Sequence, residues 1–299
     1  MHSPDIRQTV VVGVDGSPCA LRAVRWGAAE AARRRITLRL VIAFGWPVGT
    51  DRAGHGNAYV DVMTDRARIQ LAAAVVVAEQ EAPGIEVEHE LVAGSALHVL
   101  EVESRHAQLV VIGDRGLSRI EGLLLGSVTV ALATHASCPV VVVRGPERDP
   151  AETALLPIVV GVDGTPAGDP TLAFAFEAAA ARKVPLIAAH TWSDMAFDPA
   201  MASVMVSWPA IEAEESARLS ERLARWSEKF PDVALERQIT RDNPAHSLLR
   251  LAARAQLIVV GSRGRGDFAG VVLGSVSNAL LHKAPCPVAV VRSHVGETS

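Results

Sequence analysis

Two sets of spaced glycines, each ending in a serine, are the residues of this chain best suited to chemistry. The first set has the spacing G-x2-G-x9-G-S, and the same spacing returns in the second half. A glycine directly before a helix lets the backbone approach a phosphate, and the first amides of the helix are unpaired donors at the positive end of its dipole. The sequence therefore predicts two phosphate-binding loops, formed by Gly113, Gly116, Gly126 and Ser127 and by Gly261, Gly264, Gly274 and Ser275.

Charged side chains accompany both loops. Asp15 and Asp163 each follow an apolar run that we expect to be the first strand of its half. Each aspartate could contact the sugar or base of a nucleotide or a bound metal ion, or it could cap the next helix in competition with Ser17 and Thr165. Guanidinium groups beside the glycines could neutralise further phosphate charge. The arginines concerned are Arg115, Arg119, Arg263 and Arg265.

The glycine sets also have a purely structural interpretation, in which the glycines only form tight turns and the serines only cap helices. Repetition at identical spacing excludes a chance match but does not exclude a structural repeat. The expected position of both loops at the carboxyl ends of parallel strands favours the phosphate interpretation.

Other nucleotide and catalytic motifs are absent from the sequence. It contains no GxxxxGK[ST], HExxH or GxSxG pattern. The run Gly264-x-Gly266-x-x-Ala269 matches the relaxed dinucleotide-binding fingerprint by letter, but it has no counterpart in the first half, so we discount it. We expect His98 and His246 to be partly buried helical residues and not metal ligands. No general base is placed to act on a bound phosphate. The sequence therefore predicts binding rather than turnover, with no catalytic residue and no metal ligand.

The glycine sets belong to a repeat that covers almost the whole chain. Residues 11–17 read VVGVDGS and residues 159–165 read VVGVDGT, at the same offset of 148 residues that separates Gly113 from Gly261. A register of this length indicates two copies of one domain. The predicted domains are 1–149 and 150–299, with a linker at 144–157.

Each copy alternates short β-branched strands with alanine-rich helices, which predicts an α/β fold with a parallel sheet. The expected architecture is two tandem flavodoxin-like (Rossmann-like, adenine nucleotide alpha hydrolase-like) domains. Each would have five parallel strands, helices on both faces and a switch point between its first and fourth strands. Strands of the first copy are expected at 9–14, 37–43, 85–92, 109–112 and 139–143. Helix caps are expected at Ser17, Ser95, Thr165 and Asn243.

The bulk composition excludes several classes of protein. The net charge is −4, so the chain lacks the basic footprint of a nucleic-acid binder. No secretory signal opens the sequence and no long uncharged apolar stretch occurs, so we expect a soluble, cytoplasmic protein with no membrane partner. The three cysteines form no CxxC pair. We expect Cys138 and Cys286 to be buried small hydrophobic residues.

The last expected strand of each copy is almost entirely apolar, at 140–143 and 288–291. An exposed edge of this kind would promote aggregation. We expect the two edges to cover each other within one chain, as an intrachain pseudo-dimer. Whether two chains also form a homodimer is left undecided.

On these motifs the chain resembles the universal stress proteins, as a tandem actinobacterial member of the ATP-binding branch. The resemblance extends over nearly the whole chain and includes the G-x2-G-x9-G-[S/T] motif of that branch. It implies that ATP contacts Gly13, Asp15, Ala43, Gly113, Gly116, Gly126, Ser127 and Val128 in the first half. In the second half it implies Gly161, Asp163, Thr191, Gly261, Gly264, Gly274, Ser275 and Val276. At Ala43 and Thr191 the backbone would face the adenine, and Glu121 would place a carboxylate near the first phosphate site.

The resemblance implies an ATP-binding sensor or regulator in stress response or growth control, with two ATP sites. Whether Mg accompanies the ATP is left open. Two alternatives remain at this stage. One is a slow ATPase that uses Asp15 and Asp163, and the other is an adaptor that keeps the fold without needing a ligand.

Overall fold

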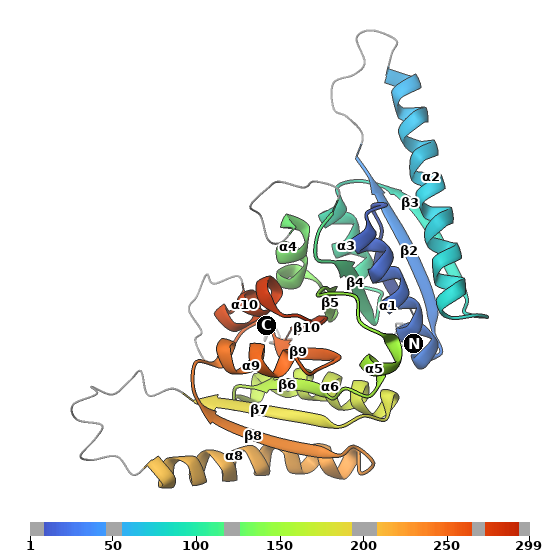
Figure 1. Ribbon diagram of the computed structural model, residues 1–299. Coiled ribbons are helices and arrows are strands. Elements are labelled where there is room, and N and C mark those ends of the chain that lie inside the picture. Colours follow the sequence, from blue (N-terminus) through green and yellow to red (C-terminus); the bar gives the residue numbers. More distant parts are fainter. Residues whose placement is uncertain (1–8, 46–55, 117–125, 193–207, 265–272, 293–299) are drawn as a thin grey trace, which may run out of the picture. The chain divides into compact units, whose positions relative to one another are not determined.

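The computed structural model describes residues 9–45, 56–116, 126–192, 208–264 and 273–292 (Figure 1). The chain divides into two compact units, Met1–Arg144 and Gly145–Ser299. The predicted domain boundary, between residues 149 and 150, lies a few residues beyond this division.

The two units repeat one order of strands and helices. The first unit contains β1 (Thr9–Gly13), α1 (Pro18–Arg34), β2 (Thr37–Phe44), α2 (Gly56–Glu81), β3 (Val87–Ala93), α3 (Ala96–Ser104), β4 (Leu109–Gly113), α4 (Ser127–His135) and β5 (Val140–Val143). The second contains α5 (Pro150–Ala154), β6 (Ile158–Val162), the 3-10 turn η1 (Pro166–Gly168), α6 (Asp169–Arg182), β7 (Leu186–Trp192), α8 (Trp208–Lys229), β8 (Leu235–Arg241), α9 (Pro244–Ala252), β9 (Leu257–Gly261), α10 (Ser275–Lys283) and β10 (Val288–Val291).

The strands form a parallel sheet in each unit, which confirms the predicted fold class. The first unit has the order β3-β2-β1-β4-β5, and the second has the equivalent order β8-β7-β6-β9-β10. The strand order therefore changes direction between β1 and β4 in the first unit and between β6 and β9 in the second, as expected. In open α/β sheets of this type, the carboxyl ends of the strands at the switch point border the ligand crevice.

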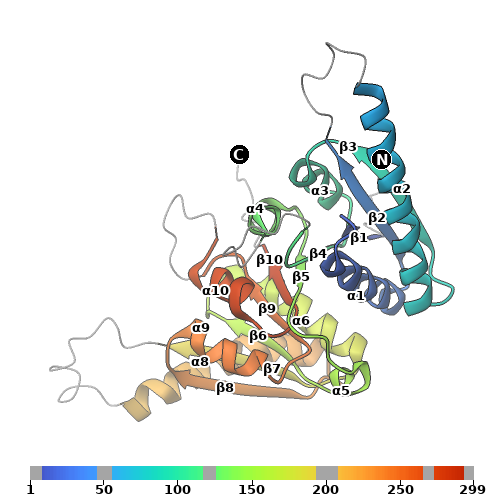
Figure 2. The ribbon, with the colours of Figure 1, turned by 45° about the horizontal axis from the view of Figure 1, so that its top comes forward.

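Helices cover both faces of each sheet, and this explains the composition of the central strands. In the first unit α1 packs with α2 and α3 packs with α4 on opposite faces, as Figures 1 and 2 show. The β4 residues from Leu109 to Ile112 are all buried, because both of their faces meet helices. β3 has no buried residue, as expected for a strand at the edge of its sheet.

Helix caps follow the sequence at three of the four predicted positions. The Ser17 hydroxyl accepts the Ala20 amide at 3.1 Å, and Ser95 and Asn243 accept the amides three residues later. The prediction for Thr165 is wrong, because its side chain makes no cap bond. Its hydroxyl donates instead to Asp163, and a 3-10 turn precedes α6.

Two other differences from the sequence prediction concern connections. The predicted linker at 144–157 contains the short helix α5, which is capped by Asp149 and begins with Pro150. The glycines and prolines of residues 44–58 predict a loop there, but α2 already begins at Gly56. In the second unit an aromatic cluster of Phe176, Trp226 and Phe230 joins α6 to α8.

The difference between Ser17 and Thr165 gives a matched test of capping. Ser17→Ala removes the side-chain acceptor of α1 and should cost the first unit about 1 kcal/mol. Native-state hydrogen exchange should show faster opening of the first turns of α1. Thr165→Ala should leave the first amides of α6 unchanged, and equal losses in both variants would contradict this assignment.

Candidate functional site

The glycine sets and the repeat-equivalent aspartates Asp15 and Asp163 meet at the switch point of each unit. β1 ends at Gly13 beside β4, and Asp15 follows two residues later. A methyl group added to Gly116 would lie 2.7 Å from the Asp15 Oδ2 atom. In the second unit a methyl group on Gly264 would lie 3.8 Å from Asp163 Oδ2. The second glycine of each set is therefore a neighbour of its aspartate, as the sequence interpretation requires.

A backbone hydrogen bond joins the start of the site helix to the residue after the fourth strand. The Gly126 amide donates to the Asp114 carbonyl at 3.2 Å. The equivalent bond in the second unit joins Gly274 to Ser262 at 2.8 Å. This bond closes the loop between the second and third glycines and holds the helix N-terminus beside the strand end.

Side-chain hydroxyls support the same closure from inside the site helices. Thr129 donates to the Gly113 carbonyl at 3.5 Å, and Ser277 donates to the Gly261 carbonyl at 2.5 Å. Both hydroxyl groups belong to buried residues. The two units therefore use one design, in which the last carbonyl of the fourth strand binds the first turn of the next helix.

The N-termini of α4 and α10 have no side-chain cap. Gly126 and Gly274 occupy the N-cap position in an extended conformation, so the N-cap residue offers no side-chain acceptor to the first amides. Ser127 and Ser275 are the first helical residues, and both are exposed. This geometry excludes the alternative in which these serines cap the helices. It leaves amide donors and a hydroxyl group at a positive helix end, which is the arrangement that binds anions.

Asp15 and Asp163 shape the corner after the first strand. One carboxylate oxygen of Asp15 accepts the Ser17 amide at 2.9 Å, and Asp163 accepts the Thr165 amide at 2.8 Å. Asp15 therefore does not cap α1, since Ser17 does. The carboxylate of each aspartate stands between this corner and the second glycine of its set.

Three of the predicted site glycines have a packing reason of their own. A side chain at Gly13 would meet Leu100, and one at Gly161 would meet Leu248, each at 3.0 Å. At Gly113 it would meet the backbone of Cys19 in α1 at 2.8 Å. These glycines allow helices to lie close to the sheet, whatever ligand the site takes.

The remaining predicted residues are placed as follows. Arg115 and Arg263 are exposed beside the second glycines, and Val128 and Val276 are half-buried in the first turns of α4 and α10. Ala43 lies near the end of β2, and the hydroxyl group of Thr191 bonds Thr240 at 3.2 Å. Arg119, Glu121 and Arg265 lie outside the described residues.

The sequence interpretation missed a buried carboxylate in the first site. Asp114 is 4 % exposed and lies 3.4 Å from the Nη2 atom of Arg22. Burial, followed by the negative charge of Asp114, raises the pKa of the nearby Cys19 thiol. The offset of 148 residues places Ser262 at the equivalent position of the second unit, so the repeat gave no signal for this group.

It also missed a cavity of about 800 Å³ in the second unit. The cavity lies between the corner at Asp163 and the side chains of α8, and His190 and Glu215 line it. None of the four glycine-set residues of this unit lines it, although Asp163 and Thr165 do. We base the phosphate site on the helix N-terminus and not on this cavity.

The two repeat-equivalent helical histidines lie at the surface. His98 and His246 are exposed and not partly buried as expected, and His246 bonds Asp242 through Nδ1 at 3.0 Å. Within the described ranges no group of three or more His, Cys, Asp or Glu side chains could hold a metal ion. Cys138 and Cys286 are buried as predicted.

Comparison with known proteins gives one family for both halves. The model of the universal stress protein family matches residues 7–144 and 156–292. A universal stress protein of Mycolicibacterium smegmatis is 40 % identical over 95 % of this chain and 96 % of its own length. One of Mycobacterium tuberculosis is 38 % identical over 98 % and 99 %.

A solved structure agrees with the fold. The crystal structure of a universal stress protein from Archaeoglobus fulgidus superposes with a TM-score of 0.69 at 20 % identity, over 98 % of both chains. Among the described helices, none is both long enough and apolar enough to cross a membrane.

Cys19 gives a test of the buried Asp114 charge. Because its raised pKa reduces the thiolate fraction, Cys19 should react slowly with iodoacetamide at pH 8. Asp114→Asn removes a negative charge, so the pKa should fall and alkylation should become several-fold faster. Mass spectrometry of the labelled peptide measures the rate, and Cys19→Ser serves as the blank. An unchanged rate in a variant with a native circular dichroism spectrum would contradict the electrostatic assignment.

Proposed function

The chain belongs to the universal stress protein family as a tandem member, and on this premise we propose that it is a regulator that binds one ATP in each half. Nucleotide occupancy would favour one conformation or partner over another in stress response or growth control. The family and the α/β fold support this proposal of ATP as the ligand.

The observation that carries the proposal is the uncapped helix N-terminus in both units. The amides of Ser127 and Val128, and those of Ser275 and Val276, are the donors that would hold the phosphates. The third glycine of each set directly precedes them, so no side chain there keeps a phosphate away. Both helix starts are bonded to the preceding loop, so the donors are held in place before the ligand arrives.

The aspartates and arginines would complete each site. Asp15 and Asp163 would contact the sugar, the base or an ion that accompanies the nucleotide, and Arg115 and Arg263 would add positive charge. Magnesium in such sites is bound mainly by phosphate oxygens and water, with one or two protein carboxylates. The aspartate after the first strand of each unit is consistent with that chemistry, and a dedicated protein cage is not needed.

The second glycine of each set allows a direct test. Gly116→Ala and Gly264→Ala each add one methyl group beside an aspartate in a backbone conformation that alanine can adopt. At Gly264 the nearest atom would be 3.8 Å away, and at Gly116 the Asp15 carboxylate would have to shift. We expect each single variant to stay folded and to lose one ATP per chain, and the double variant to lose both.

Isothermal titration calorimetry on the full chain measures this loss, which should reach about a hundredfold in affinity or more at each site, or ~2.8 kcal/mol. Gly84→Ala is the control, because Gly84 has a φ of 83° but lies in open space away from the site. It should reduce stability without changing ATP binding. A wild-type chain that binds no ATP, or a double variant that binds it as tightly, would refute the proposal. A double variant that loses ATP but keeps its full cellular effect would favour the ligand-independent adaptor.

A further inference from the structure

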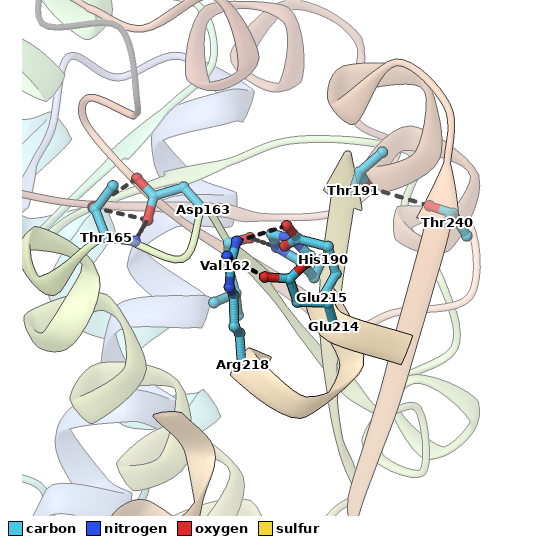
Figure 3. Close-up of polar contacts among 9 residues, drawn as sticks. All are labelled: Val162, Asp163, Thr165, His190, Thr191, Glu214, Glu215, Arg218 and Thr240. Atoms are coloured by element: carbon cyan, nitrogen blue, oxygen red, sulfur yellow. Dashed lines mark hydrogen bonds and ion pairs between the residues drawn. The ribbon is translucent and has the colours of Figure 1, made fainter. Parts of the chain in front are cut away.

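His190 of β7 is a buried histidine whose two ring nitrogens both face acceptors (Figure 3). It is 2 % exposed. Its Nδ1 atom lies 2.7 Å from the Val162 carbonyl oxygen, and its Nε2 atom lies 2.8 Å from the Glu215 carboxylate. The ring therefore connects α8, which carries Glu215, to the last residue of β6.

These partners determine how the ring must be protonated. A backbone carbonyl only accepts hydrogen bonds, so Nδ1 carries a proton. When the Glu215 carboxylate is ionised it also only accepts, so Nε2 then donates to it and both ring nitrogens act as donors. Arg218 supports the ionised form of Glu215 by donating to its other oxygen at 3.1 Å, and it also bonds Glu214. Charge-assisted bonds of this kind are stronger than neutral ones.

The bond to Val162 acts on the peptide group that leads into Asp163. On the other side of this corner, the Asp163 carboxylate accepts both the amide and the hydroxyl group of Thr165 (Figure 3). The chain from Val162 to Thr165 is thus fixed from two directions, once by α8 through His190 and once by its own turn.

The first unit has no equivalent of this connection. At the offset of 148 residues, His190 and Glu215 correspond to Ile42 and Ala67, both of which are buried. Gln70 of α2 packs directly over Gly16, so a methyl group at Gly16 would overlap its side chain. In the first unit, α2 therefore contacts the strand corner through the close packing of the Gln70 side chain.

In the second unit the same space is open. Polar residues take the place of the small buried residues of α2, with Glu215 in place of Ala67 and Arg222 in place of Ala74. The cavity of about 800 Å³ separates the corner from much of α8. Since close packing is reduced here, the His190–Glu215 pair is a specific connection between this helix and the end of β6.

We infer that His190, held by Glu215 and Arg218, is a positioning residue that sets the Asp163 corner of the second nucleotide site, and that this makes the two sites unequal. The inference rests on the proposed function. It makes ATP affinity in the second half depend on α8, whereas the first half has no such dependence. Removing one partner of a buried pair leaves the other charge uncompensated, so the effect should be large.

The test uses the full chain with the first site blocked by Gly116→Ala, so that calorimetry reports the second site alone. Glu215→Gln keeps the shape of the side chain but removes its charge, and it should weaken ATP binding about tenfold, or ~1.4 kcal/mol. Glu214→Gln is the matched control, since Glu214 bonds Arg218 but not His190. It should change the affinity less than about twofold. In a chain with the second site blocked by Gly264→Ala, Glu215→Gln should leave ATP binding at the first site unchanged.

A second variant and a spectroscopic measurement exclude a general loss of structure. His190→Ile with Glu215→Ala installs the pair that the first unit already uses, and it should fold and show the same weakening at the second site. Nitrogen-15 NMR of the His190 ring should show both nitrogens protonated in the parent, and the Nε2 proton should be lost in Glu215→Gln.

The outcomes separate this inference from the proposed function. A parent chain that binds no ATP refutes both. A parent that binds ATP, together with a Glu215→Gln variant of equal affinity, refutes only the positioning role of His190. A neutral His190 ring in the parent would also overturn it.

Discussion

In each half of the molecule, the candidate site depends on a backbone hydrogen bond that joins the residue after the fourth strand to the start of the next helix. Gly126 donates to Asp114 in one half, and Gly274 donates to Ser262 in the other. Together with the Thr129 and Ser277 hydroxyl groups, this bond holds the first amides of α4 and α10 beside the ends of β4 and β9. Because the bond uses only main-chain atoms, it survives the replacement of Asp114 by Ser262.

This constraint explains what the repeat preserves and what it has lost. The positions that shape the backbone are the same in both copies, including the three glycines, the serine after them and the aspartate after the first strand. The surrounding charges differ. Asp114 with Arg22 occurs only in the first half, and His190 with Glu215 only in the second. The two sites share one backbone geometry but have different charged side chains around them. They can therefore differ in how they respond to a ligand.

Much of the architecture could be predicted from the sequence because its causes are local or periodic. The run from Leu109 to Ile112 is apolar at every position, which indicates a strand buried on both faces, and Ser17 before Pro18 indicates a helix start. The glycine spacing predicted a phosphate loop in each half, and the structure brings Gly116 and Gly264 to their aspartates. Thr165 shows where local reasoning fails, because a nearby carboxylate competed for its hydroxyl group.

The features that were missed share a physical cause. His190 and Glu215 are 25 residues apart, and Arg22 and Asp114 are 92 residues apart. Such pairs depend on which side chains the fold brings together, and neither pair recurs in the other copy, so the repeat could not reveal them. The helix α5 was missed for a different reason, because a linker that contains several prolines is typical of a loop. In the structure Asp149 caps the helix and Pro150 begins it.

The most direct measurement is a crystal structure of the full chain grown or soaked with millimolar ATP. The account predicts that phosphate oxygens lie within hydrogen-bonding distance of the Ser127 and Val128 amides and of the Ser275 and Val276 amides. Clear density for ATP at some other place, with both helix N-termini empty or blocked by the protein's own side chains, would contradict it.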